Sequence, residues 1–352
     1  MSPIIIPLAG LTKPAAGVTP TNPETAPVAI PTEVDLPSFI YSIKPQVINP
    51  AAAEICVVVK GNSAPPTASW LPPLNPNHPN HSKPVPNKIC VTLWGGGLLG
   101  KDLDFAGGTV VHISSGVSAL VLASLIGSRS NHPEGVKPPH NVTQILLGTG
   151  LLWFGWFGFN GGSQLAVGGA ELPFTTTHIS AAAGLIAWGF IEYINEGKST
   201  SVGMATGAVS GLVGVTPAAG FVNPASGMII GLITSVLCFY SIKLKNKLQF
   251  DDSLDTFAVH GVGGTVGAIL TGFFASYDLI SSHPAGQIFI EKGRIGLVFG
   301  QFQAIFIAYG ISAIGTLLIA LIIKKAGIEF RVSKEEEEKG LDFIEHGEKS
   351  YT

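Results

Sequence analysis

The sequence predicts an all-α, polytopic membrane protein with about seven transmembrane helices. Its mean hydropathy is +0.42. Only 12% of its 352 residues are charged, whereas soluble domains are close to about 25% charged. After Trp94 the chain contains long runs with few charges, which is the pattern of segments that cross a bilayer.

Seven such runs approach the length of about 20 residues that a transmembrane helix needs. They are residues 105–127, 142–160, 174–194, 203–222, 225–243, 256–276 and 295–323. The fourth run is the least hydrophobic. Its Gly207-xxx-Gly211 spacing is typical of helices that pack closely against a neighbour.

The distribution of basic residues between these runs predicts the orientation in the membrane. The loops after runs one, three and five and the segment after run seven hold Arg129, Lys137, Lys198, Lys243, Lys245, Lys247, Lys324, Lys325 and Arg331. The alternate loops hold only Lys292 and Arg294. Because basic residues favour the cytoplasmic side, the first run should start outside. The C-terminus should then lie in the cytoplasm, below a plasma membrane or a bacterial inner membrane.

The first 93 residues differ sharply in composition from the rest of the chain. Of the 25 prolines, 18 lie within residues 1–90, and 41 of the 44 glycines lie after residue 93. Proline-rich segments without a long apolar run do not form packed cores. The sequence therefore predicts a disordered leader over 1–93, a transmembrane domain over 94–324 and a cytoplasmic regulatory tail over 325–352.

Two apolar, glycine-rich segments carry a histidine with an aspartate just before it. One runs from Asp104 to His112 and the other from Asp255 to His260, and the histidines are 148 residues apart. An ionisable side chain inside a membrane span is expensive and marks a functional site by default. The aspartates are preferred residues for the beginning of a helix.

Four runs separate the two histidine segments, so these segments cross the membrane in opposite directions. At 1.5 Å per residue, His112 should lie about 12 Å from the outer helix end and His260 about 8 Å from the inner one. The two depths bracket the midplane without coinciding, and spacing alone does not predict contact. Three interpretations remain: a metal site, a structural hydrogen-bonded pair, and a pore pair that handles a small proton-bearing solute. The pore pair is favoured, since imidazole both donates and accepts near neutral pH.

The second run ends in five aromatic residues interleaved with glycines, from Trp153 through Trp156 to Phe159, followed by Ser163. Aromatic faces attract a desolvated cation, and a serine hydroxyl can accept a hydrogen bond from it. Trp94 should lie at the same outer surface. The alternative is an interfacial aromatic belt, which would explain about half of these residues.

Other classes of function have little support. The net charge of −3 offers no basic surface for nucleic acid. The three cysteines, Cys56, Cys90 and Cys238, indicate neither a disulfide framework nor a zinc site. No loop carries a nucleophile–base arrangement or a cofactor motif, so we expect neither an enzyme nor a bound cofactor.

At these residues the chain strongly resembles the Amt/Rh ammonium transporter family, on the Amt side. The matching stretches are Trp94-Gly-Gly-Gly, Leu103-Asp-Phe-Ala-Gly-Gly-Thr-Val-Val-His112, Trp156-Phe-Gly-Phe-Asn-Gly-Gly-Ser163, Thr216-Pro-Ala-Ala-Gly-Phe-Val222, Asp251-Asp-Ser-Leu-Asp-Thr-Phe-Ala-Val-His-Gly-Val-Gly-Gly264 and Lys339-Gly-Leu-Asp-Phe-Ile-Glu-His-Gly-Glu348.

The resemblance implies a role for each site residue. His112 and His260 would be the twin pore histidines, and Phe159 would be the inner of two stacked gate phenylalanines. Trp94 and Ser163 would belong to the outer ammonium site.

Four further residues complete the predicted site. Asp104 would recruit or deprotonate ammonium while ordering the mouth of the pore. Trp156 would line the pore, and Asp252 and Asp255 would support it.

The resemblance also implies a larger architecture than the seven runs provide. The family fold has eleven helices in two inverted repeats, forms trimers with one pore per subunit and, in bacteria, binds a PII-type signalling protein. The runs found here correspond to helices 5–11, and residues 1–93 do not supply the other four. We therefore expect a truncated or mis-assembled gene model that does not transport as written. A pseudogene product is the next explanation, and a genuine seven-helix family member is the least favoured.

The function expected from the resemblance is ammonium transport across a lipid bilayer. An ammonium sensor and an Rh-type neutral gas channel are the alternatives. The tail is expected either to be a solvated end or to dock on the cytoplasmic face of neighbouring subunits through Leu341, Phe343 and Ile344.

Overall fold

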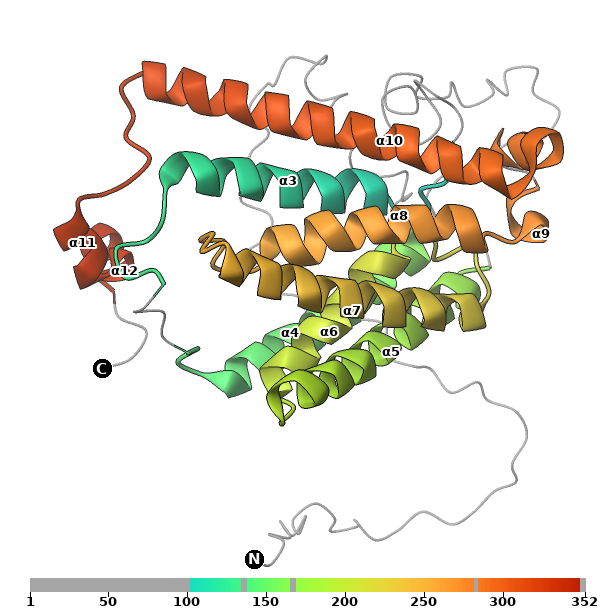
Figure 1. The fold of residues 1–352 in the computed structure, drawn as a ribbon, viewed down its shortest axis with the longest axis horizontal. Coiled ribbons are helices and arrows are strands. Elements are labelled where there is room, and N and C mark those ends of the chain that lie inside the picture. Colours follow the sequence, from blue (N-terminus) through green and yellow to red (C-terminus); the bar gives the residue numbers. More distant parts are fainter. Residues whose placement is uncertain (1–101, 134–137, 165–168, 282–283, 349–352) are drawn as a thin grey trace, which may run out of the picture. The chain divides into compact units, whose positions relative to one another are not determined.

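The computed structural model describes residues 102–133, 138–164, 169–281 and 284–348, and within these ranges all regular structure is helical (Figure 1). The predicted all-α fold is therefore confirmed. Trp94 and the predicted leader over 1–93 lie outside the described residues.

The helices follow the predicted runs closely. They are α3 (Gly108–Ile126), α4 (Val142–Gly162), α5 (Glu171–Glu196), α6 (Ser201–Val215), α7 (Pro224–Lys247), the π-helix η3 (Phe257–Val262), α8 (Gly263–Phe274), α9 (Tyr277–Ile280), α10 (Pro284–Lys325), α11 (Lys334–Lys339) and α12 (Leu341–His346). In the described part of the chain, six segments are long and apolar enough to cross a membrane: α3, α4, α5, α7, η3 with α8, and α10.

The predicted fourth run is shorter as a helix than expected. Instead of 203–222, α6 covers Ser201–Val215 and has 15 residues. The chain then turns, and the amide of Ala218 bonds to the carbonyl of Val215. Proline removes a backbone donor, and Pro217 stands in this turn. Asn223 begins α7 by accepting a hydrogen bond from the amide of Ser226.

Small residues let α5, α6 and α7 pack at close range. A Cβ atom added to Gly207 would collide with Trp188, and one added to Gly211 would collide with the backbone at Ser180. The Ser180 hydroxyl donates to the carbonyl of Gly211 over 2.8 Å. Here the glycine spacing singled out in the sequence does mediate close helix packing.

Helix α10 consists of two helical parts joined at Gly293. This residue has φ 63° and ψ −163°, a conformation open almost only to glycine. Beside the break, the Arg294 guanidinium donates to the carbonyl of Ala275 over 3.0 Å and also to that of Phe273. The predicted last run, 295–323, therefore starts just after a real interruption of the helix.

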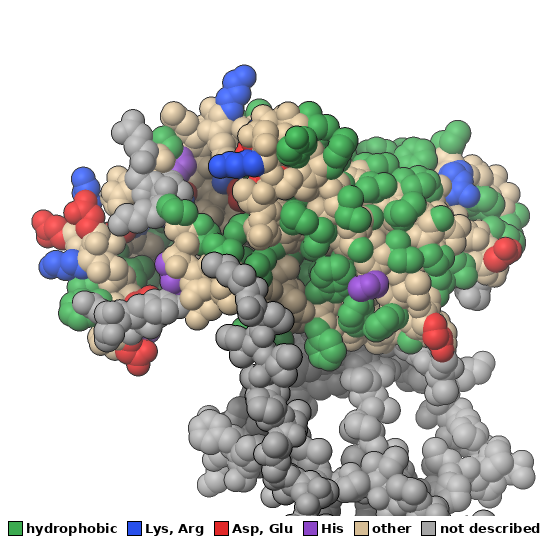
Figure 2. Space-filling view, turned by 90° about the horizontal axis from the view of Figure 1, so that it is seen from below, with side chains coloured by type: hydrophobic (Ala, Val, Ile, Leu, Met, Phe, Trp, Pro, Cys, Tyr) green, Lys and Arg blue, Asp and Glu red, His purple; other side chains and the backbone are tan. Residues whose placement is uncertain are grey.

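Apolar side chains cover much of the outside. Phe154 on α4 is 74% exposed and Phe306 on α10 is 73% exposed. Figure 2 shows hydrophobic side chains spread over much of one face, with many of the charged ones gathered toward one end. Exposed apolar surface of this extent marks an interaction or membrane surface, which fits a chain embedded in lipid.

The loop after α3 is tied to two other segments. The Arg129 guanidinium forms a bidentate pair with Asp251, at 2.6 Å and 2.9 Å. The next residue, Ser130, donates its amide to Glu337 of α11 over 2.8 Å, and Arg331 donates to the same carboxylate over 2.7 Å. The tail thus contacts the loop after α3 through α11, whereas Leu341 and Phe343 of α12 stay about half exposed.

Candidate functional site: a buried histidine pair

The two histidines meet at the crossing of α3 and η3. Nδ1 of His112 lies 3.2 Å from Nδ1 of His260, and the ring centroids are 5.2 Å apart with 34° between the planes. His112 is 4% exposed. Because one nitrogen must carry the hydrogen and the other must not, the two neutral rings share one proton between them.

Glycines allow this contact, which spacing along the helices does not predict. A Cβ atom at Gly116 of α3 would collide with the backbone of Gly261 in η3, and a Cβ at Gly264 would lie 3.0 Å from Cβ of His112. The backbones of the two helices therefore touch. The π-helical turn at 257–262 carries His260 directly into this contact.

An aromatic wall covers one side of His112. The ring of Trp156 stacks on His112 at 5.3 Å with 22° between the planes, and Phe159 meets it edge-on at 6.4 Å. The Trp156 indole donates to the Thr216 hydroxyl over 2.9 Å. This hydrogen bond fixes the stacked ring. The motif from Thr216 to Val222 contains this threonine, but the sequence alone does not pair its hydroxyl with Trp156.

Asp104 lies just before α3 and accepts hydrogen bonds from the amides of Thr109, at 3.1 Å, and Val110, at 3.2 Å. It therefore satisfies amides at the beginning of the helix, as its residue type predicts. Loss of hydration raises the pKa of Asp104 to about 7, against the lowering effect of the amide of Thr109, and nearby Asp102 raises it further. The group is therefore able to exchange a proton near neutral pH.

The two aspartates before η3, Asp252 and Asp255, make other contacts than the sequence predicts. Asp252, not Asp255, accepts from the amide of Phe257 at the start of η3, over 2.8 Å. Asp255 has φ 53° and pairs with Lys245 at 2.6 Å. A side chain held by an ion pair to α7 is not directed at the helix end, so the capping role expected for Asp255 belongs to Asp252.

The remaining predicted residues are less closely tied to the pair. The Ser163 hydroxyl ends α4 and donates to the carbonyl of Phe159 over 2.8 Å, which leaves its oxygen lone pairs able to accept. Trp94 cannot be placed, because it lies outside the described residues. Within the described ranges, no three His, Cys, Asp or Glu side chains come together as metal ligands.

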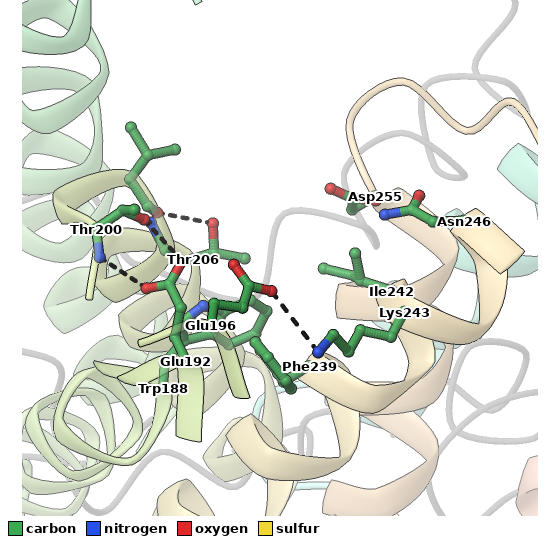
Figure 3. A pocket seen from close by; sticks show the side chains of 12 residues that line it. Trp188, Glu192, Glu196, Thr200, Thr206, Phe239, Ile242, Lys243, Asn246 and Asp255 are labelled. Atoms are coloured by element: carbon green, nitrogen blue, oxygen red, sulfur yellow. Dashed lines mark hydrogen bonds and ion pairs between the residues drawn. The ribbon is translucent and has the colours of Figure 1, made fainter. Parts of the chain in front are cut away.

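A separate polar cavity of about 430 Å³ lies between α5, α6 and α7 (Figure 3). Its carboxylates are already partnered. Glu192 accepts from the amide and the hydroxyl of Thr200, at 2.8 and 2.9 Å, and Glu196 pairs with Lys243 at 3.7 Å. The lining of the cavity does not include His112 or His260. The contacts of Glu192 and Glu196 join the end of α5 to the start of α6 and to α7.

Comparison with known proteins assigns the family. The model of the Ammonium Transporter Family matches residues 83–351. The chain belongs to the ammonium transporter family. The match begins 11 residues before the boundary at 94 expected from composition.

The sequences of other family members agree. The ammonium transporter of Bacillus subtilis (strain 168) is 44% identical over 263 residues, which is 74% of this chain and 64% of that protein. Ammonium transporter Amt1 of Archaeoglobus fulgidus is 41% identical over 74% of this chain and 66% of its own length. The chain therefore spans less than two thirds of the length of these relatives.

Solved structures of the family agree as well. The crystal structure of Saccharomyces cerevisiae Mep2 has a TM-score of 0.60 and 38% identity, over 67% of this chain and 55% of that one. A structure described as a Sensor Amt Protein has a TM-score of 0.62 and 33% identity, over 70% and 60%. This ammonium transporter family member is thus a multi-pass membrane protein of a transporter family, not an enzyme family.

Proposed function

We propose that this protein moves ammonium across a membrane past His112 and His260. The observation that carries the proposal is the state of His112. Its Nδ1 faces His260, while its buried Nε2 has no hydrogen-bond partner among the described residues. A buried polar nitrogen without a partner costs free energy, and a substrate that donates or accepts a hydrogen bond would relieve this cost.

The chemistry of the pair suits a substrate that carries protons. If the Nδ1 hydrogen sits on His112, its Nε2 is an acceptor for an N–H of the substrate; in the other tautomer, Nε2 is a donor. Three proton movements together exchange these roles and leave both rings neutral: uptake of a substrate proton at Nε2 of His112, transfer of the Nδ1 hydrogen to Nδ1 of His260, and release of the Nε2 hydrogen of His260. The pair thus both binds the substrate and passes a proton.

Capture at the outer mouth supplies the first step. NH4+ is attracted to the partly exposed ring of Phe159, and Ser163 accepts a hydrogen bond from it. The buried ring of Trp156 lines the path farther in, against His112. Asp104, whose pKa lies near neutrality, takes up or releases a proton at the outer mouth. Trp94 belongs to the same capture site by resemblance.

The other half of the path belongs to the part of the relatives that this chain does not match. Phe159 is 37% exposed and Val111, next to His112, is 48% exposed. The ring of His260 is only partly buried as well. An ionisable group of a pore does not face lipid, so the open side of His260 needs a covering segment equivalent to the first four helices of the relatives. The 352-residue chain by itself should therefore not conduct.

The complete protein forms a trimer with one pore per subunit in a plasma membrane or a bacterial inner membrane. Its C-terminus lies in the cytoplasm, where the tail contacts subunits and a PII-type signalling protein. Resemblance over 339–348 and the basic residues of the inner loops support this arrangement.

Growth of a strain that lacks its own ammonium carriers tests the function. One strain carries the 352-residue chain. The other carries the joined protein, in which residues 103–352 follow the helices that precede the equivalent position in the Bacillus subtilis relative. We expect growth on low ammonium only with the joined protein, and no growth when it carries His112→Ala. Growth with the 352-residue chain would refute the inference that its pore lacks part of its wall.

Two further arms separate the alternatives. A carrier of the ion gives an ammonium-dependent current in proteoliposomes, whereas an Rh-type gas channel gives uptake without current. A sensor binds ammonium without either.

A further inference from the structure

We infer that Gln301 is a positioning residue for the outer mouth of the pore: it holds the backbone of Leu103 and so places the Asp104 carboxylate. This inference rests on the proposed function for the importance of Asp104. Gln301 lies on α10 and is fully buried. A carboxamide in the middle of a membrane helix is expensive unless it is fully hydrogen-bonded.

Both ends of the carboxamide bond to one residue. Oε1 of Gln301 accepts from the Leu103 amide over 2.9 Å, and Nε2 donates to the Leu103 carbonyl over 2.7 Å. The side chain thus satisfies the donor and the acceptor of one buried residue that belongs to neither a helix nor a sheet. Glutamine is the natural choice, because its amide carries both functions at the same distance from the backbone.

Packing holds the glutamine itself in place. A Cβ atom added to Gly272 of α8 would lie 3.1 Å from Cγ of Gln301. Leu297, one turn earlier on α10, belongs to the same apolar cluster as Leu103. The position of the carboxamide is therefore set by α8 and α10.

Asp104 lies between two backbone anchors. On one side, Leu103 is held by Gln301; on the other, the amide of Phe105 donates to the carbonyl of Pro217 over 3.0 Å. The carboxylate between them reaches Thr109 and Val110 at the start of α3. Since three consecutive residues have little freedom left, release of Leu103 would let the carboxylate move away from the helix and into water.

Hydrogen exchange on the full chain in nanodiscs tests this directly. In Gln301→Leu, the amides of Thr109 and Val110 should exchange at least about tenfold faster than in the parent, a change of about 1.4 kcal/mol. Thr316→Val is the matched control, because it removes another hydrogen bond made by α10, of 2.8 Å from Thr316 to Ser118 of α3, far from Leu103. It should leave these amides unchanged.

The variant Gln301→Glu adds a readout that lost packing cannot mimic. A protonated glutamate donates and accepts as glutamine does, whereas the ionised form only accepts. The pKa of a buried glutamate is raised, so exchange at Thr109 and Val110 should match the parent at low pH and accelerate as pH rises. The charged groups nearby are Asp102 and Asp104 on the held segment and Arg294 on α10, while α8 has no titratable side chain. The exchange rates of the variant are therefore divided by those of the parent at the same pH.

Equal acceleration in Gln301→Leu and Thr316→Val, or unchanged exchange in Gln301→Leu, would overturn the positioning role. A pH-independent Gln301→Glu would overturn it as well. In the joined protein, Gln301→Leu should raise the ammonium concentration at half-maximal uptake at least about threefold, and Thr316→Val should not. If the joined parent does not transport, the proposed function fails while the exchange result still decides the role of Gln301.

Discussion

His112 is held from three directions, and each contact restricts a different motion. Trp156 stacks on its face, Phe159 meets it edge-on and His260 bonds to its Nδ1. A ring fixed in this way keeps Nε2 at one position, which is what a binding group for a small solute requires. His260, by contrast, is only partly buried, so the two rings are not equivalent.

In the joined protein, His112→Ala or His260→Ala should lower ammonium uptake at least about tenfold, because a hydrogen bond to a charged group contributes about 1.5–3 kcal/mol. Uptake by proteoliposomes at fixed protein density measures this. His132→Ala, in the loop after α3, is the control and should remain close to the parent. A loss with His132→Ala as large as with His112→Ala would mean that the path lies elsewhere.

Among the helices, the close contact between α3 and η3 allows the two histidine rings to meet. Gly116→Ala should place a methyl group against the backbone of Gly261 and destabilise the protein by about 1–3 kcal/mol. It should also separate the histidines. The free energy of unfolding in detergent and ammonium uptake both report the change.

Gly150→Ala on α4 is the matched control, since nothing lies within 4 Å of the added Cβ atom. It should be neutral or stabilise the helix by up to about 1 kcal/mol. Equal destabilisation by both variants would contradict a specific backbone contact at Gly116.

The pair between Arg129 and Asp251 joins the loop after α3 to the loop after α7, and its strength depends on pH. The Arg129 guanidinium holds the pKa of Asp251 below its usual range. A carboxylate with a lowered pKa stabilises the folded state above its unfolded pKa of about 3.9, and this contribution disappears as pH falls through the lower folded pKa. Because Arg129 is half exposed, the effect is modest.

We expect Asp251→Asn to lower stability by about 0.5–1 kcal/mol at pH 7 and to approach the stability of the parent as pH falls below the unfolded pKa of about 3.9. Thermal unfolding at several pH values measures this difference. Glu338→Gln, at an exposed ion pair of 3.9 Å with Lys334, is the control and should change stability less. A difference between parent and Asp251→Asn that grows as pH falls would contradict the assignment.

At the scale of the whole molecule, the tail contacts the loop after α3 through Glu337 of α11. Gly340 lies between α11 and α12 with φ 95°, where a side chain is strained. Gly340→Asp should displace α12 and its half-exposed Leu341 and Phe343. If α12 docks on a neighbouring subunit, co-expression of this variant with the parent should lower uptake below that of the parent alone.

Gly347→Asn serves as the control in the same assay. Gly347 ends α12 with φ 66° and ψ 16°, a left-handed conformation that asparagine tolerates. Activity equal to the sum of the two subunits in the Gly340→Asp mixture would mean that the tail is a solvated end.

Composition and periodicity were sufficient for the all-α membrane class, and the runs 105–127, 142–160 and 225–243 match α3, α4 and α7 closely. Helices that cross a bilayer satisfy their own backbone hydrogen bonds. The length of each apolar run therefore predicts the helix without reference to tertiary contacts. Sequence reasoning failed where tertiary contacts compete. It extended α6 to residue 222 and gave Asp255 the capping bond that Asp252 makes.

The sequence also singled out His112, His260, Asp104 and the aromatic stretch, because charged and aromatic groups inside apolar runs stand out without any structure. Their arrangement was decided only in three dimensions. The helical rise placed the histidines at different depths, yet the glycine contacts at Gly116 and Gly264 bring their rings together. Gln301 and Thr216 lie far from the histidines along the chain. Sequence spacing contains no information on which side chains meet across helices. Only the packing of α4 beside α6 revealed Trp156 as the partner of Thr216, and only the packing of α10 beside the segment before α3 revealed Leu103 as the partner of Gln301.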